Sequence, residues 1–290
     1  MHLVVKNLRD KSIKLELTLG GDNDTSHLRL YENYTETLLF LCVLAMSEDS
    51  LEDWKSYQFR GAVFQGNGLE ITSYWEGMEE GTRYLLEHVC DLFSVQVQSV
   101  LLEDDSLWIA DLVEQRQGPQ SYYVEFDDPQ LTDEQYIHLF VDLSPHTLIL
   151  SSEPSEQFRI EHFQKTYERL DILSGHWITG ENLLTLDCHR LNIYGKYFTV
   201  AEINRFFRHV LIDAGAPRLT EFVCQVEKID ENGLLDGIRE VLAPIPGKEQ
   251  FEDNEHFWTF RGLLHRGDRS VTASIAYYKN SNKCIELRIE

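Results

Sequence analysis

The fold is decided by residues 177–211, which read WITGENLLTLDCHRLNIYGKYFTVAEINRFFRHVL. Residues 191–194 alternate apolar and polar side chains with a period of two, which predicts a strand. Thr199 and Glu202 then form a capping box, in which each side chain satisfies a free backbone N–H at a helix start. The apolar residues after the box recur at helical spacing on one face: Ile203, Phe206, Phe207, Val210 and Leu211. With Gly215 as a stop, the stretch predicts an amphipathic helix folded back onto a strand.

The same strand–helix alternation extends over residues 81–245. Short apolar strands are predicted at residues 95–102, 146–150, 169–173, 190–194 and 219–223. Helices are predicted to begin at Gly81 and at Thr132, where Thr132 and Gln135 form a second capping box, and residues 106–111 form a further short apolar element. The strands are irregularly spaced. The pattern predicts an irregular leucine-rich-repeat-like array, in which each unit buries its apolar face against its neighbour.

Strands flank this array on both sides. On the N-terminal side, residues 13–19 alternate with a period of two, which predicts a strand with one face in water. Further strands are predicted at residues 27–31, 56–64 and 69–75, the last two joined across a turn with an Asn-Gly pair. On the C-terminal side, residues 257–264, 271–278 and 284–289 predict an antiparallel meander.

The predicted fold class is therefore mixed α/β (α+β): a strand–helix array between N-terminal antiparallel strands and a C-terminal β meander. The predicted domain organisation has three parts. They are an N-terminal β-rich segment at residues 1–80, the strand–helix array at 81–245 and the meander at 246–290.

The composition excludes several classes of function. The 290 residues carry a formal net charge of -23, and this acidic surface repels phosphate backbones and anionic lipid. The chain is therefore predicted to bind neither nucleic acid nor a membrane surface. The longest apolar run, residues 38–46, is far shorter than the ~20 residues of a membrane helix and is predicted to be a buried segment.

The cysteines point to a reducing compartment. All five stand alone in the sequence, at Cys42, Cys90, Cys188, Cys224 and Cys284, whereas a secreted disulfide framework is denser and even in number. Residues 1–10 carry charges and no long apolar core of a signal peptide. These features predict reduced thiols and a location in the cytoplasm or the nucleus.

No recognised catalytic, phosphate-binding or metal-binding motif is present. Cys188 and His189 are adjacent, but neighbouring residues on a strand point to opposite faces, so they are not expected to form a catalytic pair. The eleven histidines are scattered, and the acidic residues Glu103, Asp104 and Asp105 lack the glycine and spacing of a calcium loop. The sequence therefore predicts no enzyme site, no cofactor and no metal, and it does not identify the binding residues.

A family resemblance rests on the same stretch. The run from Trp177 to Cys188, the short strand after it, the threonine-capped helix and the Pro-x-Leu strand together resemble the F-box-associated domain (type 2) of nematode F-box proteins. The matching positions are Trp177, Leu183, Leu184, Cys188, Thr199, Asn204, Phe206, Phe207, Pro217 and Leu219. The resemblance is most specific over residues 167–222 and extends more loosely to residues 85–150.

In this family, an F-box is expected to bind the Skp1-type adaptor of a cullin ubiquitin ligase, and the associated domain is presumed to hold the substrate. An F-box needs roughly 45 residues, and strand structure is predicted here from Ser12 onward. We therefore expect the chain to lack an F-box and do not count the adaptor among its expected partners.

The resemblance implies a non-catalytic protein–protein recognition module, like the substrate-binding part of an F-box protein in a ubiquitin ligase. Trp177, Leu184, Phe206 and Phe207 are expected to lie in the core, not at the contact surface. Two alternatives are an enzyme whose site is assembled only by the fold, and a stand-alone decoy that binds F-box targets without delivering them.

Overall fold

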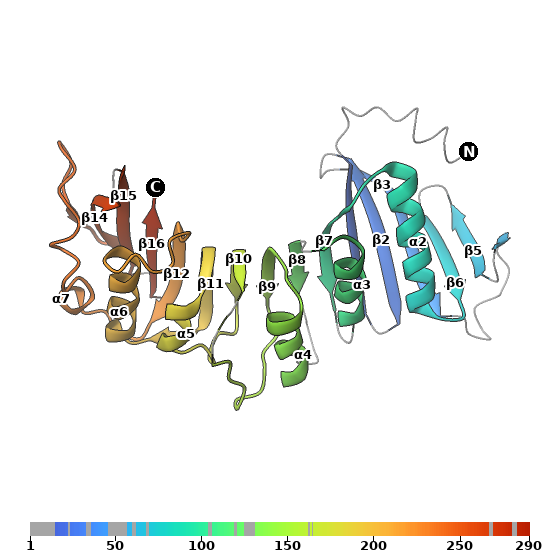
Figure 1. Ribbon diagram of the computed structural model, residues 1–290, viewed down its shortest axis with the longest axis horizontal. Helices are drawn as coiled ribbons and strands as arrows, with labels where there is room; N and C mark the ends of the chain where they lie inside the picture. Colours follow the sequence, from blue (N-terminus) through green and yellow to red (C-terminus); the bar gives the residue numbers. More distant parts are fainter. Residues whose placement is uncertain are drawn as a thin grey trace. The chain divides into compact units, whose positions relative to one another are not determined.

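The structure is a computed structural model that describes most of the chain. The described residues are 15–22, 24–32, 36–45, 57–59, 62–67, 70–103, 106–118, 121–124, 131–161, 163, 165–266, 269–279 and 283–290. The chain divides into two compact units (Figure 1). Unit 1 comprises Met1–Gln130 with Leu143–Pro145, and unit 2 comprises Leu131–Asp142 with His146–Glu290. The three-part division expected from the sequence stays a prediction.

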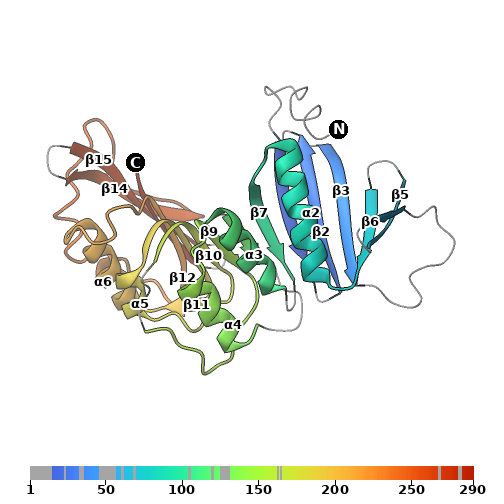
Figure 2. The ribbon, with the colours of Figure 1, turned by 45° about the vertical axis from the view of Figure 1, so that its right-hand side comes forward.

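Unit 1 is a sheet with two helices. Its strands are β1 (Leu15–Gly21), β2 (Thr25–Glu32), β3 (Glu36–Ala45), β4 (Tyr57–Phe59), β5 (Ala62–Asn67), β6 (Glu70–Trp75), β7 (Val97–Leu102) and β8 (Ser121–Val124). They lie in the order β8-β7-β1-β2-β3-β6-β5-β4. Helix α2 (Met78–Phe93) packs across β2, β3 and β6, and α3 (Leu107–Gln117) packs against β1 and β7 (Figure 2).

Several predictions for unit 1 needed correction. Residues 106–111 begin a helix, α3, and residues 56–64 do not form one strand but contribute to β4 and β5. Helix α2 begins at Met78, three residues before the predicted start. The predicted wet face of β1 is wrong, because Glu16 is only 2% exposed. Strand β1 is an inner strand between β2 and β7, so the side chains of both neighbours flank its own on either face.

His27 on β2 gives unit 1 a predicted pH dependence. Burial, followed by the charge of Arg29, lowers the pKa of His27 from 6.5 to about 4, against an opposing effect of Asp22. Between pH 6.5 and 4 the unfolded chain therefore binds more protons at this residue, so folding stability falls as the pH falls through that window. We expect a loss of about 2–3 kcal/mol from this group.

The check is urea denaturation of the full chain between pH 7.5 and 4, compared with the variant His27→Gln. Other groups titrate in the same range, so the difference between the two proteins is the informative quantity. The free energy of unfolding of the variant, relative to that of the unsubstituted protein, should rise as the pH falls. Stability curves that stay parallel would show that His27 does not titrate as described.

Unit 2 combines a parallel and an antiparallel half in one sheet. Its strands are β9 (Thr147–Leu150), β10 (Thr166–Ile172), β11 (Asp187–Phe198), β12 (Glu221–Val226), β13 (Phe251–Asp253), β14 (Phe257–Arg266), β15 (Arg269–Tyr278) and β16 (Cys284–Ile289). The order is β13-β14-β15-β16-β12-β11-β10-β9. Strands β9 to β12 are parallel, and β16, β15, β14 and β13 continue the sheet antiparallel from β12.

Helices line one side of this sheet. They are α4 (Asp133–Ile137), which continues into the π-helical turn η2 (His138–Asp142), α5 (Gly180–Thr185), α6 (Val200–Leu211) and α7 (Glu231–Leu234). Capping boxes start α4 at Thr132 and α6 at Thr199, as predicted. A third box, at Thr179, starts α5, which the sequence did not predict.

The core of unit 2 forms where α6 meets the parallel strands. The apolar face predicted for α6 is buried from Ile203 to Leu211, and the ring of Phe206 lies 4.7 Å from that of Phe222 on β12. Inward-facing residues of β10, β11 and β12 are buried: Leu170, Ile172, Leu191, Ile193, Phe222 and Cys224. The mixed α/β class and the C-terminal meander are therefore confirmed.

Two further observations concern the compartment and the membrane. All five cysteines are free thiols. Among the described residues, no helix is both long and apolar enough to span a membrane.

Candidate functional site

The candidate site is the face of the unit 2 sheet that lies opposite α5 and α6, here called the open face. Successive side chains of a strand point to opposite sides of the sheet, so each residue beside a buried one faces outward. On β10, Leu170 and Ile172 are buried against the helices, and Arg169 and Asp171 lie on the open face. The same alternation places Arg190, Asn192 and Tyr194 of β11 there.

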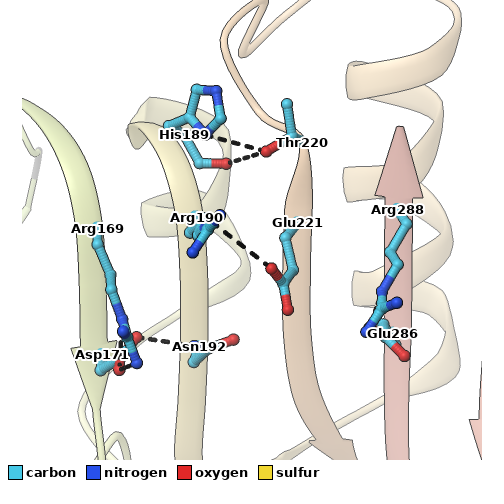
Figure 3. A network of polar contacts seen from close by, with 9 residues as sticks. All are labelled: Arg169, Asp171, His189, Arg190, Asn192, Thr220, Glu221, Glu286 and Arg288. Carbon is cyan, nitrogen blue, oxygen red and sulfur yellow. Dashed lines mark hydrogen bonds and ion pairs between the residues drawn. The ribbon is translucent and has the colours of Figure 1, made fainter. Parts of the chain in front are cut away.

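A row of arginines crosses the open face. The strand register pairs Arg169 with Arg190, Arg190 with Glu221, and Glu221 with Arg288. It continues from Arg288 through Ser274 to Arg261. These six residues, named here the arginine row, come from six strands of the sheet. Figure 3 shows Arg169, Arg190, Glu221 and Arg288 side by side.

A buried carboxylate holds the first arginine of the row. Asp171 Oδ2 accepts hydrogen bonds from Arg169 Nε at 2.9 Å and Nη2 at 2.6 Å. Its Oδ1 accepts a third from Asn192 Nδ2 at 2.7 Å. The residue is only 6% exposed, so these three donors compensate the burial of its charge (Figure 3).

A second carboxylate, Glu286, has the same role near the other end of the row. Its Oε2 accepts a hydrogen bond from Tyr278 Oη at 2.7 Å, and its Oε1 accepts one from Arg288 Nε. The hydrogen bond to Glu286 and burial raise the pKa of Tyr278, so this phenol stays protonated as a donor. Glu286 is also 6% exposed. Each buried carboxylate thus fixes an arginine two residues away on its own strand.

Arg190, next to Arg169 in the row, is held less tightly. Its Nε forms an ion pair with Glu221 Oε2 at 3.8 Å, which is beyond hydrogen-bond distance, and its side chain makes no hydrogen bond within the described part of the chain. The side chain is 55% exposed. Its donors therefore remain available to an external acceptor.

An aromatic and apolar band borders the arginine row. Tyr278 and Leu173 are exposed large side chains, and the ring of Phe257 lies 6.3 Å from that of Tyr278. Tyr194 precedes Gly195, which has φ +72. A Cβ at Gly195 would lie 2.8 Å from Leu173 O, so glycine is required there for β11 to pass close to the end of β10.

His189 and Thr220 lie beside the row, directly before Arg190 and Glu221 in the sequence. Thr220 Oγ1 lies 3.0 Å from His189 Nδ1 and donates to the backbone oxygen of His189 at 3.1 Å (Figure 3). Because the hydroxyl proton goes to that oxygen, Nδ1 of His189 is the donor to Oγ1. The pair fixes the alignment of the two strands.

Cys188, the cysteine next to His189 in the sequence, is a buried free thiol. Burial, followed by the charge of Asp187, raises the pKa of its thiol. That this side chain and the neighbouring His189 diverge stays a prediction. Among the described residues, no group of three or more His, Cys, Asp or Glu is placed to hold a metal ion.

The residues that the sequence singled out lie away from the open face. Trp177, Phe206 and Phe207 are buried, as predicted, and Leu184 is half-buried. The sequence did not identify the open-face residues as a site, although the alternation of polar and apolar residues in these strands indicated that they face outward. That alternation marks an outward residue, but it does not reveal which strands become neighbours.

Comparison with known proteins identifies the same segment. The F-box associated family model matches residues 159–224, which include β10, α5, β11, α6 and the start of β12. This match contains residues 167–222 and confirms the resemblance found in the sequence. No curated protein and no solved structure matches the chain.

Proposed function

We propose, from the premise that residues 159–224 are an F-box associated domain, that the chain is a non-catalytic protein-recognition module. It resembles the substrate-holding part of an F-box protein and binds a protein target on its open face, in the cytoplasm or the nucleus. The observation that carries the proposal is the arginine row, which passes through the matched segment, where Arg190 is exposed and is held only by its ion pair with Glu221.

The composition of the open face supports this proposal. Arginine and tyrosine are enriched among the residues that contribute most to protein–protein binding. Here arginines alternate with carboxylates that hold them in place, and Tyr278 and Leu173 supply exposed apolar area beside them. Side chains fixed on a sheet lose little conformational freedom on binding, which favours affinity.

The parallel strands β9 to β12 support a finer part of the proposal. They succeed one another in sequence and lie side by side, with α5 and α6 in the connections between β10, β11 and β12. In an array of the leucine-rich-repeat type, aligned strands present a continuous binding surface, and the helices back it. We assign this role to β9–β12.

The proposal concerns target binding, and delivery to a ubiquitin ligase is a separate step. A substrate receptor must also engage a Skp1-type adaptor, whereas a decoy binds the same target without it. Recovery of the adaptor with the chain would favour the receptor, and recovery of the target alone would favour the decoy.

Affinity capture from cells, with mass spectrometry of the retained proteins, tests the proposal. The variant Arg190→Ala should reduce recovery of specific partners by at least about tenfold, because truncation of an arginine anchor in an interface typically costs about 2 kcal/mol or more. The matched control is Arg205→Ala, on α6, where Arg205 pairs with Glu181 on the helix side. Equal recovery with both variants, or a selective loss with the control, would refute binding by the open face.

A further inference from the structure

We propose that a groove at the end of the arginine row binds a single anionic side chain, carboxylate or phosphate, of the protein target. The inference rests on the proposed function and specifies what the target presents. The groove lies on the antiparallel half of the sheet, outside the segment that matches the family model.

The groove has the size of a side chain. Its volume is about 290 Å³, at the low end for ligand pockets. Its floor is formed by β14, β15 and β16, and residues 245–248 reach over its rim with Ile245 and Lys248. It is therefore too small for a large ligand and suited to one anchored group.

Two arginines flank a hydroxyl on the floor. Arg261 of β14 is the register partner of Ser274 on β15, and Ser274 is the register partner of Arg288 on β16. Strands lie about 4.8 Å apart, so the two arginines start roughly 10 Å apart with Ser274 between them. Two guanidinium groups and a hydroxyl facing one space are well matched to the oxygens of a carboxylate or phosphate.

Several donors in the groove have no acceptor. Arg261 Nη2 donates to Glu252 at 2.8 Å and to Thr259 at 3.2 Å, but its buried Nε has no hydrogen-bond partner among the described residues. Arg288 donates through Nε to Glu286, and neither its Nη groups nor the Ser274 hydroxyl makes a hydrogen bond within the described part. A bound anion would accept hydrogen bonds from the Arg288 Nη groups and from the Ser274 hydroxyl, which line the groove.

The charge balance of the groove limits the kind of target. Arg261, Arg288 and Lys248 line the groove with Glu286 and Glu290, and Glu252 pairs with Arg261, so the three cations are balanced by three carboxylates. Glu286 already accepts from Tyr278 and Arg288, so it competes weakly for an incoming donor. The net charge of -23 repels a highly acidic segment at long range. The fitting partner is therefore a neutral or basic segment with one anionic side chain.

The test is an NMR titration of the arginine Nε–H signals of the full chain with sodium phosphate or sodium acetate at constant ionic strength. Signals of Arg261 and Arg288 should shift and saturate, and that of Arg205, on the helix side, should stay unchanged. Arg261→Ala should weaken binding by roughly tenfold, as loss of one charge-assisted contact implies. If Arg261→Ala fails to fold, Ser274→Asp is the alternative variant. It places a carboxylate in the groove and should abolish the chemical-shift response to the anion.

Capped tetrapeptides Gly-Tyr-X-Gly, with phosphoserine, glutamate or serine at X, then distinguish a phosphate from a carboxylate as the bound group. Tighter binding of the phosphoserine peptide assigns a phosphate, and tighter binding of the glutamate peptide assigns a carboxylate. Equal binding of the serine peptide, or shifts that are equal at Arg205, would overturn the anion site. The titration tests the anion site and needs no target, whereas the capture experiment with Arg190→Ala tests target binding. Either proposal can therefore fail while the other is supported.

Discussion

Replacement of Trp177 by alanine is expected to lower the free energy of unfolding of unit 2 by about 3–5 kcal/mol. Trp177 is 1% exposed and lies at the centre of an aromatic cluster. Its ring centroid is 5.0 Å from that of Phe158, 5.4 Å from Phe140, 6.0 Å from Phe163 and 6.2 Å from Tyr136. Alanine would leave a cavity among four rings that are fixed by different segments and cannot close it together.

The control for this variant is Trp177→Phe. It keeps an aromatic ring and removes the indole Nε1, which is buried without a hydrogen-bond partner among the described residues. Phenylalanine should therefore cost much less than alanine in urea denaturation followed by far-ultraviolet circular dichroism. A loss below about 1 kcal/mol for Trp177→Ala would contradict its place at the centre of the core, because large-to-small core substitutions cost more.

Asn182→Ala is expected to cost about 3 kcal/mol, because it leaves several buried polar groups unsatisfied at once. Asn182 Oδ1 accepts from the backbone N–H and the hydroxyl of Thr179, both at 2.8 Å. Its Nδ2 donates to the backbone oxygens of Ile160 at 2.6 Å and Glu161 at 3.2 Å. One side chain thus caps α5 and ties the segment before β10 to it.

A matched substitution is available at Asn232, an exposed asparagine on α7. Asn232→Ala should change stability by less than about 0.5 kcal/mol, as is usual for exposed sites. The two variants are compared by urea denaturation of the full chain. Equal effects would show that the hydrogen bonds of Asn182 contribute nothing specific.

Local features of the sequence predicted the elements that have strong local signals. The capping boxes at Thr132 and Thr199 and the apolar face of α6 were readable because they lie within a few residues. Helix α5 was missed because it spans only six residues, and its box uses Asn182 in place of the usual glutamate or glutamine. Strand β8 was missed because four residues are too few for a period of two to stand out.

The open face could not be predicted, because it depends on contacts between distant segments. Alternation marks Arg190 and Arg288 as outward residues, but their alignment requires β12 and β16 to be neighbours. That pairing joins residues 59 to 67 positions apart and follows from burial of Phe222 and Leu287 on the other side of the sheet. Register of this kind is set by the folded core and not by local pattern.

The most direct test of the account is site-specific photo-crosslinking in cells. The photoreactive amino acid p-benzoylphenylalanine would replace Tyr194 on the open face or Arg205 on the helix side, each in the full chain. The account predicts covalent adducts with a protein partner from position 194 and none from position 205. Adducts formed only from position 205, or equally from both, would contradict the claim that the open face is the recognition surface.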